Sequence, residues 1–318
     1  MKKKTALIFG ITGQDGPYMS KILLKKKYIV HGICRKKNYT NLHKLDLYKK
    51  VNLHLFPKID KKKIFKLLNK NFDEIYFLGG QSSVTESFKN ETETYESQIE
   101  PLKIILDFIT FQKNKKTKLL YACSCEIFGT INKKNKIKED SKKKPNSPYA
   151  LSKLIGYEII KSYRNMYKLP ICSAILFNHE SSLRTEKFVF KKIVDYLDKI
   201  KKNKNKNKKL HLGNIEVKRD WGWAPDYMKA CYKILNTKKI DDYIIATGKT
   251  TSLKNLVYLC FKHYNLDWKK YVIINKKNFR NFETKENYAN IKKIKKNIKW
   301  SPAYTYKEVI KKLINKNL

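Results

Sequence analysis

The sequence predicts an α/β protein built on a doubly wound parallel sheet, with helices on both faces and a smaller C-terminal part. Three observations indicate this fold. Apolar runs of strand length alternate with stretches of helical spacing, a glycine-rich turn follows the first run, and polar residues follow later runs.

The N-terminal unit has the order strand, glycine turn, helix, strand. We expect a strand at Thr5–Phe9, a helix at Tyr18–Lys27 and a second strand at Tyr28–Ile33. Glycines at 10, 13 and 16 let the chain turn sharply and let a pyrophosphate reach the backbone N–H groups at the helix start. This context makes the glycine pattern a dinucleotide-binding signal, and a purely structural turn is the weaker alternative.

Arg35 follows the second strand, at the position where an NAD-preferring site usually carries an acidic residue for the ribose hydroxyls. A guanidinium can instead bind a 2′-phosphate with two hydrogen bonds. We therefore expect NADP as the cofactor, with Arg35 as the residue that recognises its 2′-phosphate.

The same alternation continues downstream. Strands are expected at Asp73–Leu78, Leu119–Ala122 and Ile171–Leu176, with a helix from about Ser97 to Thr110. Ligands of such sheets bind outside the carboxyl ends of the strands. Three residues fall at such ends: Gly80, Ser124 and Glu126.

Tyr149 and Lys153 are four residues apart in the stretch SPYALSK, so they share one face of a helix. An ammonium close to a phenol favours the phenolate, which makes Tyr149 a candidate base near neutral pH. A lone match to this spacing is more often an ordinary amphipathic helix. The nearby hydroxyl of Ser124 and carboxylate of Glu126 favour a catalytic site here.

Composition excludes several classes of protein. The chain has 318 residues, of which 42% are apolar, and carries 71 Lys and Arg against 28 Asp and Glu, a net charge of +43. The lysines are spread over the whole length of the chain. The low-complexity run Lys199–Lys209 lacks the interleaved aromatic residues on which bases stack, so we interpret it as a solvated loop. We therefore expect no nucleic-acid partner. The six cysteines show no disulfide or zinc spacing, and no segment is long and apolar enough to cross a membrane. We expect a soluble cytoplasmic protein without a structural metal.

A set of motifs resembles the extended short-chain dehydrogenase/reductase superfamily and, within it, the GDP-mannose 4,6-dehydratases. The motifs are GITGQDG, GGQSSV, S-x-E, SPYALSK, LFNHES at Leu176–Ser181 and RDWGWAPDY at Arg219–Tyr227. The resemblance runs from Leu7 to about Leu313. It implies an NADP-binding Rossmann domain at 1–171 with the catalytic residues, and a mainly substrate-binding part at 172–318, interwoven with the first.

The resemblance also implies a mechanism. Tyr149, helped by Lys153 and Ser124, removes the proton of the sugar 4-hydroxyl while the C4 hydride passes to NADP. Glu126 takes the C5 proton as water leaves C6, and the hydride returns to C6. The product feeds deoxyhexose synthesis for surface polysaccharides, and the expected assembly is a homodimer or homotetramer.

Binding roles implied by the resemblance fall into two groups. The cofactor group is Gly10, Thr12, Gly13, Gln14, Asp15, Gly16, Arg35, Gly80, Tyr149, Lys153, His179 and Arg184. The substrate group is Ser82, Ser124, Glu126, Asn178, Lys192, Arg219, Arg280 and Glu283, with Glu180 in the same pocket loop as Asn178. For His179 we favour a structural over a catalytic role, because no acidic partner is spaced for it in the sequence.

Two departures from the family pattern leave questions open. Pro57-Lys58 stands where relatives have an aspartate that contacts the adenine, and Asp60 is the nearest residue that could take its place. In the second departure, Ser182-Leu183-Arg184-Thr185 replaces a Pro-Arg-Arg-Gly loop that is involved in contacts between subunits. The alternatives are a dehydratase of another nucleotide sugar such as a GDP-heptose, a C4 reductase or epimerase, and, from a different class, a basic binding module on an inactive scaffold.

Overall fold

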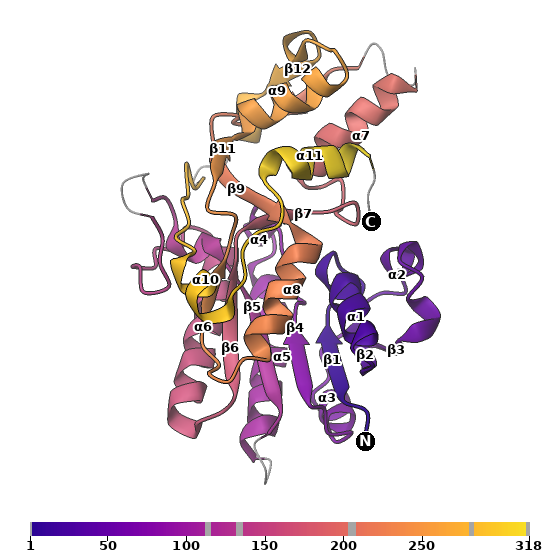
Figure 1. Ribbon diagram of the computed structural model, residues 1–318, viewed down its shortest axis with the longest axis vertical. Coiled ribbons are helices and arrows are strands. Elements are labelled where there is room, and N and C mark those ends of the chain that lie inside the picture. Colours follow the sequence, from indigo (N-terminus) through magenta and orange to yellow (C-terminus); the bar gives the residue numbers. More distant parts are fainter. Residues whose placement is uncertain (1, 112–115, 132–135, 203–207, 280–282, 316–318) are drawn as a thin grey trace.

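The computed structural model describes residues 2–111, 116–131, 136–202, 208–279 and 283–315. Its central feature is a sheet of seven strands, all parallel, which confirms the predicted fold class (Figure 1). In spatial order the strands are β3 (Asn52–Leu55), β2 (Ile29–Cys34), β1 (Thr5–Phe9), β4 (Glu74–Phe77), β5 (Lys118–Ser124), β6 (Ile171–Leu176) and β10 (Tyr243–Ile245).

Helices cover both faces of this sheet. One layer contains α1 (Asp15–Lys25), α8 (Ala224–Leu235) and α10 (Lys292–Ile298), and the other contains α3 (Lys61–Leu68), α5 (Glu91–Phe111) and α6 (Pro148–Tyr167). Strands buried on both faces carry mainly apolar side chains: all six residues of β6 are buried, and Ser173 is the one polar residue among them.

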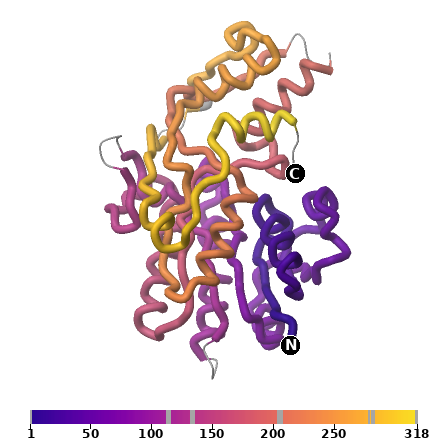
Figure 2. Tube along the Cα trace, in the orientation of Figure 1, coloured from indigo at the N-terminus to yellow at the C-terminus, as the bar shows by residue number. Residues whose placement is uncertain are grey.

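A second, smaller hydrophobic core lies beyond the carboxyl edge of the sheet. It packs apolar side chains from α7 (Val189–Lys201), α9 (Leu253–His263), α11 (Tyr306–Ile314), β8 (Leu210–Leu212) and β12 (Val272–Ile274). Trp221 and Trp223 of β9 (Lys218–Trp223) join it. The chain crosses between the two cores repeatedly, because α8, β10 and α10 return to the large core (Figure 2). The division at residue 171 stays a prediction.

Short strands bridge the two parts. A three-stranded sheet has the order β11 (Thr250–Ser252), β9, β7 (Asn178–Glu180), in which β7 runs parallel to β9. A parallel pair, β8 and β12, lies at the far end. The remaining short helices are α2 (Thr40–Lys44) and α4 (Val84–Ser87).

The predicted element bounds agree best where a strand is wholly apolar. Thr5–Phe9 and Ile171–Leu176 are strands with the predicted bounds, whereas α1 begins earlier than expected, at Asp15, because the last glycine of the turn already has helical geometry. The prediction of a loop over Lys199–Lys209 is wrong at its start, because α7 continues to Lys201. Residues 203–207 lie outside the described part of the chain.

No helix in the described ranges combines the length and the low polarity needed to cross a bilayer.

Candidate active site

The carboxyl end of β5 presents two of the predicted catalytic residues. Ser124 ends the strand, and its Oγ accepts a hydrogen bond from the Glu126 backbone N–H at 3.2 Å. This bond starts a single 3₁₀ turn, Cys125–Phe128, which Gly129 ends with a φ of 66°. The turn buries Ile127 and Phe128 and leaves the Glu126 side chain partly accessible. The local sequence thus places a hydroxyl and a carboxylate on the same edge of the sheet.

Tyr149 and Lys153 lie on the first two turns of α6. The Ser147 side chain caps this helix by accepting from the Ala150 N–H, and Pro148 occupies its first turn. The side chains of Tyr149 and Ser124 lie near enough for a polar contact that acts on the pKa of Tyr149, which brings the two candidates together. Burial raises the pKa of Tyr149, a rise that the contact with Ser124 opposes and the charge of Glu126 increases.

Lys153 lies beside Tyr149 and is held from two sides. Its Nζ donates to the Ala122 carbonyl at 2.7 Å and to Gln98 Oε1 at 2.9 Å, and it lies 6.0 Å from the centroid of the Tyr149 ring. Burial lowers the pKa of Lys153 to about 8. Burial thus acts on both residues, lowering the pKa of the ammonium and raising that of the phenol.

The glycine turn is closely packed against the sheet. Gly10 has a φ of 83°, and a Cβ there would lie 2.7 Å from the Gly79 Cα. A Cβ on Gly16 would lie 2.5 Å from the Ile11 Cα. Gln14 is the N-cap of α1, but its side chain makes no capping hydrogen bond. The first N–H groups of α1 are thus without a side-chain cap, and they suit a dinucleotide pyrophosphate.

Asp15 and His179 form an ion pair that sequence spacing did not reveal. His179 Nε2 lies 3.0 Å from Asp15 Oδ2, and Nδ1 lies 2.7 Å from the Phe177 carbonyl oxygen. Because both ring nitrogens face acceptors, the imidazole donates from both and is cationic. Burial acts to lower the pKa of His179, but the charge and hydrogen bond of Asp15 raise it overall. Burial acts to raise the pKa of Asp15, but His179 lowers it overall. The expectation that His179 has no acidic partner is wrong, since 164 residues separate the two.

Further side chains connect the glycine turn to the segment after β6. Gln14 Nε2 donates to the His179 carbonyl at 3.1 Å, and Ser181 Oγ donates to Gln14 Oε1 at 3.1 Å. Asn41 Nδ2 lies within 3.4 Å of the Thr12, Gly13 and Leu183 carbonyl oxygens. The turn that suits the cofactor is therefore held by residues from distant parts of the chain.

The remaining cofactor candidates lie around this turn. Arg35 directly follows β2 and forms a half-exposed ion pair with Glu93 at 3.1 Å. Gly80 has a φ of 104°, and a Cβ there would collide with Gln98, the residue that anchors Lys153. Asp60 caps α3 by accepting from the Lys63 N–H, so its carboxylate is used in the helix cap.

Arg184 and Glu180 are buried near the ion pair of Asp15. Their side chains lie 3.8 Å apart, and neither Glu180 Oε2 nor Arg184 Nε has a hydrogen-bond partner among the described residues. Burial raises the pKa of Glu180. Asn178 Oδ1 is another buried oxygen without a partner in the described part of the chain. Polar atoms of this kind suit a bound polar ligand.

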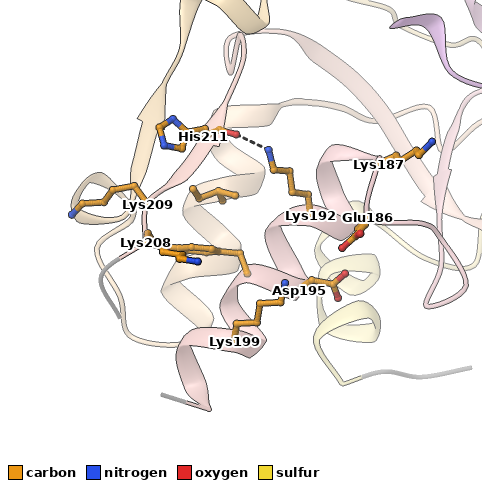
Figure 3. A pocket seen from close by; sticks show the side chains of 10 residues that line it. Glu186, Lys187, Lys192, Asp195, Lys199, Lys208, Lys209 and His211 are labelled. Carbon is orange, nitrogen blue, oxygen red and sulfur yellow. Dashed lines mark hydrogen bonds between the residues drawn. The ribbon is translucent and has the colours of Figure 1, made fainter. Parts of the chain in front are cut away.

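The candidate substrate cations are dispersed. Arg219 is buried on β9, where its guanidinium donates to the Lys218 carbonyl at 3.0 Å. Lys192 is exposed on α7, donates to the His211 carbonyl at 2.8 Å and lines an open basic pocket of about 540 Å³ (Figure 3). Arg280 lies outside the described residues. Ser82 is exposed beyond Gly80, and Glu283 is half-buried.

Three residues near the site were not anticipated. Gln98 holds Lys153, Asn41 holds the glycine turn, and Thr284 donates a hydrogen bond to Glu126. The sequence carries no signal for them, because each contact joins segments far apart in the chain.

Comparisons with known proteins agree with this geometry. A family model described as GDP-mannose 4,6 dehydratase matches residues 7–313. The chain is 34% identical to the GDP-mannose 4,6 dehydratase of Drosophila melanogaster, over 100% of this chain and 87% of the relative. It is also 34% identical to the protein of that name from Dictyostelium discoideum, over 100% of this chain and 96% of the relative.

Solved structures share the fold. The dTDP-glucose 4,6-dehydratase DesIV from Streptomyces venezuelae, with NAD and TYD bound, superposes with a TM-score of 0.86 at 18% identity, over 98% of this chain and 96% of that one. A UDP-glucuronic acid 4-epimerase from Bacillus cereus, in complex with NAD, gives 0.84 at 20% identity, over 98% of both chains.

Proposed function

Because the chain belongs to the GDP-mannose 4,6 dehydratase family, we infer that it converts GDP-mannose to GDP-4-keto-6-deoxymannose by loss of water. The observation that supports this most directly in the structure is the meeting of Ser124, Glu126 and Tyr149 at one edge of the sheet. A C4 reductase or epimerase needs the tyrosine but not the carboxylate, and the curated relatives carry the dehydratase name, so these alternatives are not favoured.

The cofactor we propose is NADP. The glycine turn has no room for a side chain at Gly10 or Gly16, and the cationic His179 offsets the charge of Asp15 beside the place for a pyrophosphate. Arg35 supports the choice of NADP over NAD, because its exposed pair with Glu93 costs little to break. Bound there, the nicotinamide would accept hydride from C4 and return it at C6.

Each catalytic side chain has a defined task in this proposal. Tyr149 removes the proton of the 4-hydroxyl, with Ser124 as its hydrogen-bond partner and Lys153 as the nearby cation. The C4 carbonyl then acidifies the C5 proton, which Glu126 takes. The electron pair of that C–H bond expels the C6 hydroxyl, and Glu126 returns its proton to the leaving oxygen, so that one water forms. When hydride adds to C6, C5 takes up one proton, which balances the proton that Tyr149 removed from the 4-hydroxyl.

The other predicted sites keep their roles as proposals. We assign the nucleotide end of the substrate to the basic pocket around Lys192, where lysine ammonium groups suit phosphate oxygens (Figure 3). Arg219, Asn178 and Arg184 would contact the sugar, the diphosphate or the cofactor phosphates.

The protein is proposed to be a cytoplasmic homodimer or homotetramer. All six cysteines are free and buried, as in a reducing compartment. On the surface of α6, Leu151 is 40% exposed and Met166 is 62% exposed, and such apolar side chains suit a subunit contact.

The test is incubation of the purified protein with GDP-mannose and catalytic NADP+, followed by mass spectrometry. We expect loss of one water without net NADPH. Glu126→Gln should lower dehydration about 10²- to 10⁴-fold and still allow C4 oxidation, seen as transient NADPH. Tyr149→Phe is the matched control and should lose both steps. An unchanged rate for Glu126→Gln would contradict the mechanism, and an unchanged substrate mass with the wild type would contradict the proposed activity.

A further inference from the structure

A segment near the C-terminus, residues 283–290, runs beside the catalytic turn and the chain that follows it. The Ile131 N–H donates to the Glu286 carbonyl at 3.2 Å, and the Ile137 N–H donates to the Tyr288 carbonyl at 2.7 Å. On its other side, the Lys218 N–H of β9 donates to the Lys285 carbonyl at 2.8 Å. The backbone on both sides of this segment is therefore fixed, and its side chains have defined positions near Glu126.

Thr284 of this segment reaches the candidate base. It is 3% exposed, and its Oγ1 lies 3.0 Å from Glu126 Oε2. Asn146 Nδ2 donates to the same Oγ1 at 3.4 Å. Because an amide nitrogen only donates and an ionised carboxylate only accepts, the threonine hydroxyl must donate its proton to Glu126. The two hydrogen bonds therefore run in one direction: Asn146 donates to Thr284, and Thr284 donates to Glu126.

We propose that Thr284 is a positioning residue for Glu126, which anchors one carboxylate oxygen so that the other is free to carry the proton from C5 to the leaving C6 oxygen. The proposal rests on the function proposed above. Thr284 occupies Oε2, and the Glu126 side chain is partly accessible, so we assign Oε1 to the substrate.

The surroundings of Glu126 offer few other groups for this task. The titratable neighbours that interact with it are Tyr149 from α6 and Cys125 from its own turn. Tyr149 is assigned to the 4-hydroxyl, and the Cys125 Sγ accepts a long hydrogen bond from Asn287 at 3.7 Å. Loss of the Thr284 hydroxyl should therefore act on Glu126 and on the donor Asn146, and leave Tyr149 with its own contacts.

The experiment compares Thr284→Val, which keeps the shape, with Thr284→Ser, which keeps the hydroxyl. With the valine we expect kcat for dehydration to fall about 10- to 100-fold, the effect of losing one hydrogen bond to a charged group, while KM changes little. The C4 oxidation rate should stay, and serine should restore kcat.

Thr250→Val is the matched control. The Thr250 Oγ1 donates to the Asn287 carbonyl at 2.8 Å, so this variant perturbs the same segment without touching Glu126. Its kcat should match the wild type. An equal kcat for Thr284→Val and the wild type would overturn the proposal.

A spectroscopic measurement without substrate separates this inference from the proposed function. At one fixed neutral pH, the carboxyl carbon signal of Glu126, assigned by comparison with Glu126→Gln, should differ in chemical shift between Thr284→Val and the wild type, because the hydrogen bond to Oε2 is lost. If this difference is seen but the wild type does not dehydrate GDP-mannose, the contact is supported and the substrate is refuted. An unchanged signal would refute the contact whatever the substrate is.

Discussion

Lys153 is a deeply buried cation of the active site. It is 5% exposed, its Nζ bonds two oxygens, and burial lowers its pKa from the usual 10.5 to about 8. In the folded protein the ammonium is thus harder to form than in the unfolded chain. An anionic partner, such as the Tyr149 phenolate during the reaction, would restore its ordinary basicity.

This difference predicts a pH-dependent stability. Between pH 8 and about 10.5 the unfolded chain binds the proton of Lys153 and the folded protein does not, so this residue's contribution to the unfolding free energy rises with pH. The difference in unfolding free energy between wild type and Lys153→Met should therefore change by about 3 kcal/mol in favour of the wild type across that window. Urea unfolding at a series of pH values measures it. Lys161→Met, at an exposed position of the same helix, is the control, and parallel curves for Lys153→Met and the wild type would contradict the expectation.

At this scale the sequence predicted the residues whose evidence is local. Ser124 with Glu126 and Tyr149 with Lys153 are short spacings on one element, and the structure brings Ser124, Glu126 and Tyr149 together. The partners Gln98 and Thr284 could not be predicted, because 55 and 158 residues separate them from Lys153 and Glu126. Contacts over such distances depend on the packing of whole elements.

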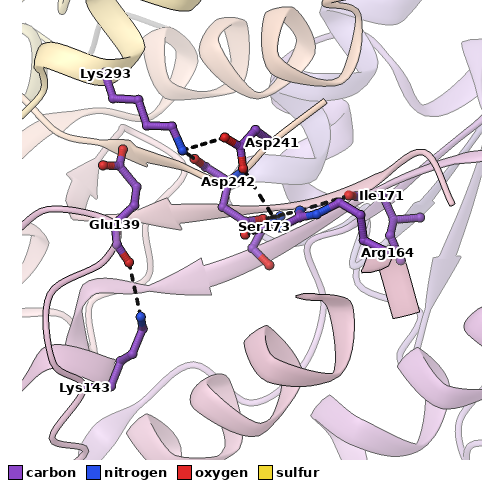
Figure 4. A network of polar contacts seen from close by, with 8 residues as sticks. All are labelled: Glu139, Lys143, Arg164, Ile171, Ser173, Asp241, Asp242 and Lys293. Atoms are coloured by element: carbon purple, nitrogen blue, oxygen red, sulfur yellow. Dashed lines mark hydrogen bonds and ion pairs between the residues drawn. The ribbon is translucent and has the colours of Figure 1, made fainter. Parts of the chain in front are cut away.

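At the scale of elements, the edge strand β10 is held by charge more than by pairing. It has three residues and pairs only with β6 in the described sheet. At its start, both terminal nitrogens of Arg164 on α6 donate to Asp242, at 2.7 and 2.6 Å (Figure 4). Asp242 also accepts from the Ser173 N–H at 2.7 Å, and Lys293 of α10 pairs with Asp241 at 2.8 Å. The strand is joined in this way to two helices and to β6.

Removing the arginine should be costly, because Asp242 would keep a buried charge without the guanidinium that pairs with it; its side chain is 4% exposed. We expect Arg164→Met to lower the unfolding free energy by about 3–5 kcal/mol. Lys293→Met, whose side chain is 30% exposed, should cost less than about 1 kcal/mol. The double variant Arg164→Met with Asp242→Asn should be more stable than Arg164→Met alone. Denaturant unfolding checks all three, and equal stability of the single and double variants would contradict the argument.

Element prediction succeeded where apolar residues are consecutive and failed where strands are very short. The strands β7, β11 and β12 have three residues each, too few for a periodic signal, and their pairing comes from tertiary contacts. Helix α5 begins at Glu91, earlier than predicted, since its first turn is polar and presents no apolar spacing.

For the whole molecule, the net charge of +43 is the dominant long-range property. A field of this sign attracts a doubly charged nucleotide sugar, and salt screens it. We expect KM for GDP-mannose to rise several-fold between about 50 and 500 mM salt, with a much smaller change in kcat. Sucrose at equal osmolality is the control. A KM that does not depend on salt would show that the lysines play no part in substrate capture.

The hydrogen bonds of His179, Gln14 and Asn41 that fix the glycine turn determine when this turn can become ordered during synthesis of the chain. The turn leaves the ribosome early, but the groups that fix it, His179, Ser181 and the Leu183 carbonyl, belong to the second half of the chain. Until those residues emerge, Asp15 has no cationic partner to offset its charge. The nascent N-terminal half can form strands and helices, but its dinucleotide-binding turn is complete only when synthesis has passed residue 184.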